Sequence, residues 1–125
     1  MAFIADRVFD SGLSVLDTEA NRIDICSQEP TTYAQATATY SLGNKAGITV
    51  SAPADRTGGG REVTVSAISD GTVTAVGTVT ATHFAVVDTV NSRLLVTAQL
   101  NASQPVTGGN VFTLTSFTVG IPDPA

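Results

Sequence analysis

Apolar and polar residues alternate along most of the second half of the chain, between Arg61 and Ile121. Residues 62–66, for example, read Glu-Val-Thr-Val-Ser, and Leu94, Val96 and Ala98 alternate in the same way further on. A period of two places successive side chains on opposite faces of a β-strand, one of which is buried. The pattern therefore predicts several half-buried strands rich in valine and threonine.

Residues that favour turns separate these stretches. Asp70-Gly71 is predicted to close a hairpin, and Asn91-Ser92 and Gly108–Asn110 are predicted to turn the chain twice more. Gly77, inside one stretch, indicates a bulge or a bend. Strands at this spacing, without intervening long helices, are typical of an antiparallel sandwich, jelly roll or barrel.

Two places depart from simple alternation. Residues 84–87 are continuously apolar, which predicts a central strand covered on both faces. Near the end, Phe112 and Leu114 share one parity, whereas Phe117 and Val119 share the other. This change of parity predicts a β-bulge near Thr115-Ser116.

The first half of the chain is less regular. Residues 1–10 are expected to form an edge strand or an N-terminal arm. The apolar residues of 13–16 and 23–26 flank a polar segment, which predicts a hairpin across Asp17–Asn21. Pro30 and the following alanines predict a short helix near 30–38, the alternative being a strand with Tyr33 and Tyr40 on opposite faces.

Another strand is predicted around Ile48 and Val50, after a turn at Gly43-Asn44. Residues 52–60 contain proline and three glycines and are expected to interrupt regular structure. The whole pattern predicts one all-β domain over residues 1–125, an antiparallel β-sandwich of jelly-roll-like type with one short helix. A chain of 125 residues is long enough to bury a core of its own.

Composition narrows the functional classes. Apolar residues make up 42% of the chain and charged residues 14%, which excludes a disordered polyelectrolyte. The net charge is −5 and the six basic residues are scattered, so a nucleic-acid footprint is not expected. The chain begins without a signal-like segment and contains no run of about 20 apolar residues, so we expect synthesis in the cytoplasm and no membrane span.

Few residues of the chain have side chains and spacing suited to catalysis, metal binding or phosphate binding. Cys26 has no partner for an internal disulfide and is expected to be a buried structural thiol. His83 lies in a predicted strand without a second histidine, and a structural role is expected for it. The oxygen-rich segment 17–24 lacks the spacing of a calcium loop. The segment Arg56–Arg61 lacks the Gly-Lys-Ser/Thr ending of a phosphate loop.

Tyr33 and Tyr40 would stack on sugar rings if they were exposed, but packing roles are expected, since the chain has no tryptophan. We therefore predict no catalytic residues, no cofactor and no metal. An exposed loop with an arginine at each end, at Arg56 and Arg61, is instead a candidate for binding an acidic neighbour.

Several segments resemble small virion proteins encoded by tailed bacteriophages and prophages. The segments are Ala2–Leu13, Cys26–Tyr33, Gly60–Val65, Ala81–Asp88, Asn91–Leu95 and Phe117–Pro124. The resemblance spans nearly the whole chain. It implies a non-enzymatic β-sandwich of the virion, in particular a head decoration (cement) protein that binds and stabilises the capsid shell.

The partners that the resemblance implies are the major capsid protein or other virion proteins, with homo-oligomerisation as a dimer or trimer. A neck, tail or fibre component and a glycan- or receptor-binding module remain the alternatives. The candidate inter-subunit contacts are apolar residues near the two ends and the two loop arginines. They are Phe3, Ile4, Val8, Phe9, Arg56, Arg61 and Ile121.

Overall fold

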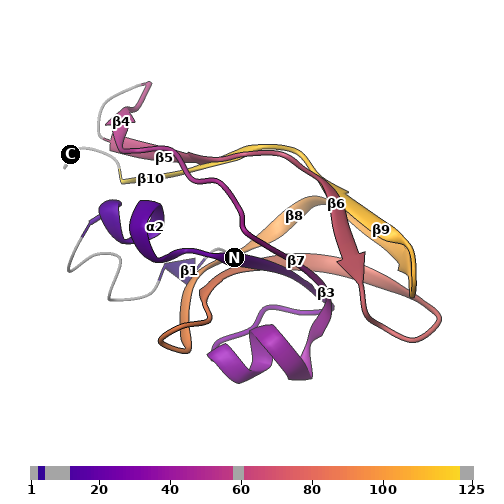
Figure 1. The fold of residues 1–125 in the computed structure, drawn as a ribbon. Coiled ribbons are helices and arrows are strands. Elements are labelled where there is room, and N and C mark those ends of the chain that lie inside the picture. The colour runs from indigo at the N-terminus through magenta and orange to yellow at the C-terminus, as the bar shows by residue number, and fades with distance from the viewer. Residues whose placement is uncertain (1–2, 5–11, 58–60, 122–125) are drawn as a thin grey trace.

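The computed structural model describes residues 3–4, 12–57 and 61–121, and they form two antiparallel sheets (Figure 1). The larger sheet has seven strands in the order β1-β8-β7-β2-β3-β6-β9, and the smaller has three in the order β10-β5-β4. The predicted all-β, antiparallel, sandwich-like class is confirmed. The strands are β1 (Phe3–Ile4), β2 (Arg22–Cys26), β3 (Ser41–Ala46), β4 (Ala54–Asp55), β5 (Arg61–Val65), β6 (Ile68–Val73), β7 (Thr78–Asp88), β8 (Arg93–Thr107), β9 (Val111–Leu114) and β10 (Phe117–Ile121).

A bent two-stranded ribbon joins the two sheets. Residue 65 of β5 pairs with residue 117 of β10, and residue 68 of β6 pairs with residue 114 of β9. The ribbon therefore keeps one register across the bend at 66–67 and 115–116, with one half in each sheet (Figure 1). Strands that pass from one sheet to the other in this way form the corners of orthogonal sandwiches. The predicted change of parity at Thr115-Ser116 is real, but it reflects this bend between β9 and β10 and not a bulge inside one strand.

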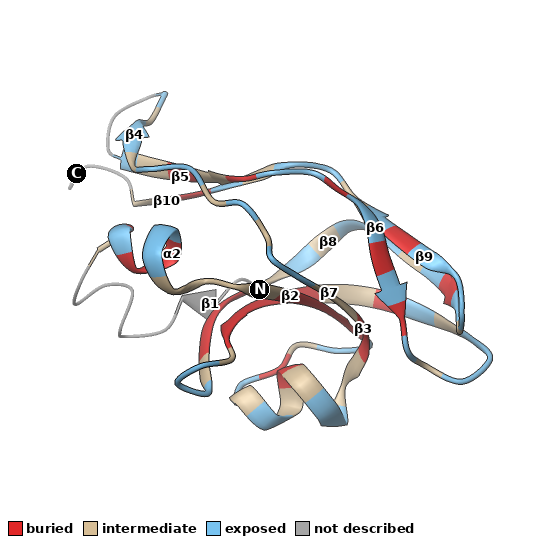
Figure 2. Ribbon diagram, viewed as in Figure 1, coloured by how far each residue is buried: buried red, intermediate tan, exposed pale blue. Residues whose placement is uncertain are grey.

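The hydrophobic core lies between the two sheets (Figure 2). Its largest fully buried side chains include Phe112, Leu16, Ile23 and Leu95. Residues 84–88 of β7 are all buried, which confirms the prediction of a central strand covered on both faces. On one face Phe84 and Val86 belong to the main core. On the other face Ala85 and Val87 belong to a second cluster with Cys26 and Ala36.

The helical segment that covers this second face is η1 (Gln35–Thr39), and it confirms the predicted short helix near 30–38. The amide of Tyr40 donates to the Gln35 carbonyl across 2.9 Å, the i→i+5 bond of a π-helix. Helical residues 33–34 precede η1, and just before them the Thr32 hydroxyl accepts a hydrogen bond from the Gln35 amide across 3.1 Å. The alternative of a strand through Tyr33 is wrong.

The predicted hairpin across Asp17–Asn21 is also wrong, because Ser14–Glu19 form a short helix, α2. Val15 and Leu16 are 3% and 1% exposed and lie in the core between the sheets, near one open end of the sandwich (Figure 1). A six-residue helix is too short to be stable alone, so tertiary burial of its two apolar residues decides the conformation. Only the second predicted strand, β2, is present.

Two glycines that suggested turns lie inside strands. Gly43 is in β3, where a Cβ would collide with the carbonyl oxygen of Thr72 in β6. Gly71 is in β6, where a Cβ would overlap the ring of Phe112. Both positions need glycine for close approach, so the turns predicted at Gly43-Asn44 and Asp70-Gly71 are wrong.

The structure also tests the predictions for Gly77, for the segment around Ile48 and Val50, and for the N-terminal residues. Gly77 ends the segment that joins β6 to β7, where a bend was one of the two expectations. The strand expected near Ile48 and Val50 is reduced to an isolated bridge between Val50 and Val65. Phe3–Ile4 form an edge strand on β8, whereas Val8 and Phe9 lie outside the described residues.

Candidate functional site

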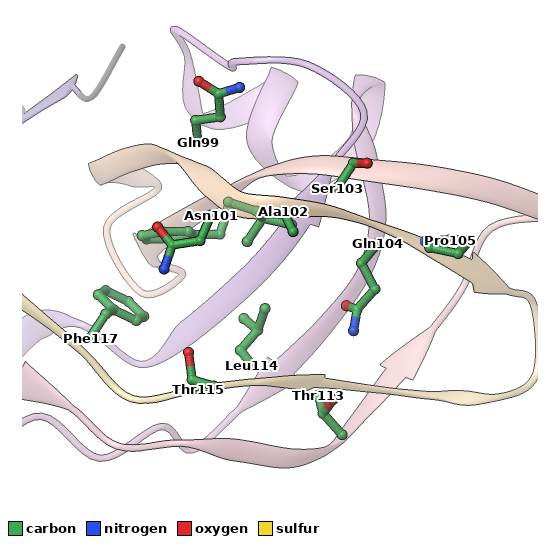
Figure 3. Close-up of a pocket in the computed structure, with 12 residues that line it drawn as sticks. Gln99, Asn101, Ala102, Ser103, Gln104, Pro105, Thr113, Leu114, Thr115 and Phe117 are labelled. Carbon is green, nitrogen blue, oxygen red and sulfur yellow. The ribbon is translucent and has the colours of Figure 1, made fainter.

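A groove of about 390 Å³ lies between β8 and the corner where β9 passes into β10 (Figure 3). Its residues come from three separate parts of the chain: the middle of β7, the second half of β8 and the β9–β10 bend. They are Phe84, Gln99, Leu100, Asn101, Ala102, Ser103, Gln104, Pro105, Thr113, Leu114, Thr115 and Phe117. None of these side chains is charged.

An irregularity in β8 forms one wall of this groove. His83 pairs with Gln99 and Ala81 pairs with Gln104, so the β8 residues 100–103 lie opposite Thr82 alone. Such an extended bulge disrupts the ladder and directs side chains out of the regular alternation. Pro105 follows at once, and a proline inside a strand is tolerated where no ladder hydrogen bond is required of it.

The floor of the groove is apolar. Phe84 is 8% exposed, and its ring centroid lies 4.4 Å from that of Phe117 with an angle of 43° between the ring planes. Leu100 and Leu114 add aliphatic surface on the two sides. The tilted contact of the two rings is a favourable aromatic geometry that fixes the orientation of the half-buried Phe117 ring.

Polar groups point into the groove from both walls. In Figure 3 the side chains of Asn101 and Gln104 extend from β8 toward β9, and Thr115 extends from the opposite wall toward them. Gln99 extends from β8 in the other direction, away from the gap. The Oε1 atom of Gln104 is buried and has no hydrogen-bond partner among the described residues. A buried acceptor without a donor is costly, and native structures rarely keep one without a reason.

Sequence reasoning missed this groove. The local signal was present in the polar run Asn101–Gln104, which interrupts the alternation between Leu100 and Val106 and is followed by Pro105. That the bend at Thr115 faces this run depends on how the larger sheet curls, which no local pattern reports.

The predicted contact residues lie in two places. Arg56, Arg61 and Ile121 come together at one end of the smaller sheet, where Ile121 pairs with Arg61 and the Arg56 side chain lies against Gly120. Arg61 donates to the Asp55 carboxylate across 2.6 Å and to the Pro53 carbonyl across 3.1 Å. Phe3 and Ile4 belong to the larger sheet instead, at the edge next to β8.

The other candidate side chains are engaged in the fold. The Nδ1 atom of His83 lies 2.8 Å from the Thr82 hydroxyl, which also approaches the Ser27 carbonyl oxygen at 2.9 Å. Asp24 is fully buried and is held by Arg22 and Ser41. Within the described ranges, no three His, Cys, Asp or Glu side chains are grouped closely enough to hold a metal ion.

Cys26 and the two tyrosines have packing roles. Cys26 is fully buried, with its Sγ atom 3.7 Å from the Ala36 carbonyl oxygen, which confirms the expected buried thiol. Burial, and secondarily the charge of Asp24, raises the pKa of Cys26 to about 12, so the thiolate is not populated near neutral pH. Tyr33 and Tyr40 are half-buried against the same cluster, which confirms their expected packing roles.

Asp88 organises the turn between β7 and β8. Its carboxylate accepts hydrogen bonds from the Val90 amide at 2.9 Å and from the Asn91 amide and side chain at 3.3 and 2.8 Å. Burial alone would raise the pKa of Asp88, but these hydrogen bonds and the charge of Arg93 outweigh it and lower the pKa below its ordinary value.

Because its folded-state pKa is depressed, Asp88 is expected to stabilise the protein fully above the unfolded-state pKa of about 3.9. That contribution is lost as the pH falls through the lower, folded-state pKa. Replacing Asp88 with asparagine should cost about 1–3 kcal/mol at pH 7 and progressively less in acid. Urea unfolding of both proteins between pH 7 and pH 2 measures this. A cost that does not change with pH would contradict the assignment.

No helix within the described ranges combines the length and the apolar character that crossing a bilayer requires. Comparison of the chain with protein-family models, with curated proteins and with solved structures found no match in any of the three. The geometry of the described residues and the resemblance noted in the sequence are therefore the grounds on which a function is proposed.

Proposed function

We propose that this chain is a non-enzymatic structural protein of a tailed-bacteriophage virion and that it decorates the head by binding the major capsid protein. The proposal rests on the resemblance of six sequence segments to small virion proteins. It gains support from a sheet scaffold in which several charged side chains pair within the fold, as with Arg22–Asp24 and Arg93–Glu19. A protein of this kind acts by binding neighbours and adding contacts between them.

The structural observation that best supports the proposal is a long part of the chain without charged side chains. Residues 71–82 and 94–121 contain no Asp, Glu, Lys or Arg. The cores of protein–protein interfaces are depleted of charged residues in the same way, because charges are costly to remove from water. We call the tip of this region the uncharged end; it comprises the segments 72–80 and 105–113.

The uncharged end is a defined place in the fold. The Gly108 amide donates to the Gly77 carbonyl, which joins the β6–β7 and β8–β9 connections. The hydroxyls of Thr78 and Thr107 lie 3.0 Å apart beside them. Val76 and Val111 are 96% and 63% exposed at this end. Exposed valines surrounded by neutral hydroxyl groups suit a surface that becomes buried against another protein.

The uncharged end is a better contact candidate than the corner around Arg56 and Arg61. The Arg61 guanidinium already pairs with Asp55 and donates to the Pro53 carbonyl, so an acidic neighbour would have to compete with Asp55 for it. The contacts predicted at Arg56, Arg61 and Ile121 stay predictions.

The test is binding to purified heads that lack a decoration protein. Wild-type protein is expected to co-sediment saturably with the heads and to raise the temperature at which they release DNA. Val76→Asp is expected to weaken binding at least about tenfold, because a carboxylate would be buried at the contact. Val90→Asp is the matched control, since Val90 is 81% exposed in the turn at the opposite end of the β7–β8 hairpin.

Failure of the wild-type protein to bind heads would overturn the proposal. Electron microscopy of gold-labelled protein on intact particles separates the shell from the neck, tail and fibres. Label confined to one vertex would favour a neck or tail component instead. Equal losses for Val76→Asp and Val90→Asp would show that the uncharged end is not the contact.

A further inference from the structure

We propose that the groove between β8 and the β9–β10 bend binds a neutral saccharide, with Phe117 as the platform and Asn101 and Gln104 as the hydrogen-bonding groups. The groove borders the uncharged end and shares Pro105 and Thr113 with it, but the proposal does not depend on the head-binding role. The glycan-binding module considered from the sequence placed the sugar on Tyr33 and Tyr40, which are packed against the outer face of the larger sheet. The groove is a different location with different residues.

The size and floor of the groove suit a sugar ring. A volume of about 390 Å³ is within the range of small-molecule sites, which begins at roughly 300 Å³. Phe117 is half-buried, held at its contact with Phe84, and presents part of its ring to the groove (Figure 3). The face of a pyranose that carries C–H groups is apolar and packs on an aromatic ring of this kind.

The walls supply the hydrogen bonds that sugar hydroxyls require. Each amide offers two donors and an acceptor in one plane, so Asn101 and Gln104 can each hold hydroxyls that both donate and accept. Thr115 faces them from the other wall (Figure 3). The buried Oε1 atom of Gln104 lacks a donor among the described residues, and a rotation of this amide toward the groove would let a sugar hydroxyl supply one.

The groove is lined by uncharged residues, which favours neutral ligands over anionic ones. With no Lys or Arg among the residues that line it, the groove has nothing to neutralise a phosphate or a carboxylate. Nucleotides and acidic sugars such as sialic acid are therefore poor candidates. A neutral hexose or N-acetylhexosamine can form hydrogen bonds with the amides and pack on the aromatic floor. Its binding carries no cost of removing a charged group from water.

An extended peptide fits the same groove less well. A strand added to a sheet edge requires evenly arranged amides and carbonyls along that edge. The wall formed by β8 lacks this arrangement, because residues 100–103 bulge from the ladder opposite Thr82. The same bulge brings the groups of Asn101 and Gln104 to the groove, which favours a compact ligand.

The experiment is NMR titration of the full chain with galactose, glucose, mannose, N-acetylglucosamine and N-acetylgalactosamine, and with disaccharides of these sugars. We expect saturable shifts confined to residues around 99–105 and 113–117 for at least one sugar. For a single ring the dissociation constant should be on the order of 1 mM, as expected for a ligand of about 12 heavy atoms. Sialic acid and a nucleoside monophosphate complete the panel and should give no saturable shifts.

Gln104→Ala and Asn101→Ala are each expected to weaken binding about tenfold or more. Asn110→Ala is the matched control, since it removes an exposed amide side chain from the β8–β9 connection, outside the residues that line the groove. Asn101 is exposed, so its variant tests the site even if Gln104→Ala affects folding. The proposal is overturned if no neutral sugar saturates, if only the charged ligands bind, or if both groove variants bind as tightly as Asn110→Ala.

Discussion

Replacing Phe112 with alanine is expected to lower the free energy of unfolding by about 3–5 kcal/mol. Phe112 is 2% exposed and is among the largest fully buried side chains of the core. Its ring fills the space that Gly71 leaves on the neighbouring strand β6, so truncation leaves a cavity over both residues. The backbone of paired strands cannot easily collapse into such a space. Urea denaturation monitored by circular dichroism measures the change.

Val111→Ala is the control for this effect. Val111 precedes Phe112 on β9 but is 63% exposed, so its truncation should change the free energy of unfolding by no more than about 0.5 kcal/mol. Similar losses for the two variants would mean that the ring of Phe112 does not fill the core as described. The midpoint should fall for Phe112→Ala without a change in the denaturant slope.

Asp24→Ala is expected to cost about 3 kcal/mol or slightly more, toward the lower end of the range for broken buried ion pairs. Asp24 is completely buried, and both of its oxygens lie 2.8 Å from guanidinium nitrogens of Arg22. Hydrogen bonding to Asp24 raises the pKa of Arg22 despite partial burial. The Ser41 hydroxyl also donates to Asp24, across 2.7 Å. Removing the carboxylate leaves a guanidinium and a hydroxyl without their acceptor, although Arg22 retains 24% exposure through which water reaches it.

The surface pair Lys45–Asp70 provides the comparison. Its atoms lie 3.0 Å apart, but the Asp70 side chain is 67% exposed, so water replaces the interaction readily. Asp70→Ala should therefore cost no more than about 1 kcal/mol. Thermal and urea unfolding of both variants test the contrast. A cost for Asp24→Ala as small as that for Asp70→Ala would contradict a structural role for the buried carboxylate.

Alternation of apolar and polar residues predicted the strands best where one face is buried and the other faces solvent, as in β5 and in the first residues of β7. It also located the central strand, because residues 84–87 are apolar at every position. The wrong predictions concern residues whose local conformational preference differs from the conformation that tertiary packing imposes. Gly43 and Gly71 favour turns locally, yet in the fold they allow Thr72 and Phe112 to approach the backbone. Val15 and Leu16 read as a strand but are buried on a helix of six residues.

The groove was harder to predict than the strands. Its amides and its aromatic floor come from β8 and β10, and their positions depend on a bulge and a bend that face each other only in the folded chain. The interruption at Asn101–Gln104 predicts that β8 is irregular, but not what lies opposite. A structural role was expected for His83, because the sequence holds no second histidine to share a metal with it. The burial of Asp24 was not predicted, since its alternation with Ile23 and Ile25 indicated a polar face, whereas Asp24 is fully buried.

The ribbon shared by the two sheets has a consequence for biosynthesis. Residue 65 finds its partner on β10 only when residue 117 has left the ribosome, and the pairing of β6 with β9 likewise waits for residues 111–114. Pairings between such distant positions slow folding, since the intervening chain must be closed first. A nascent chain that has not yet reached Phe117 would hold β5 with an open edge and valines uncovered, the state in which chaperones would be most needed.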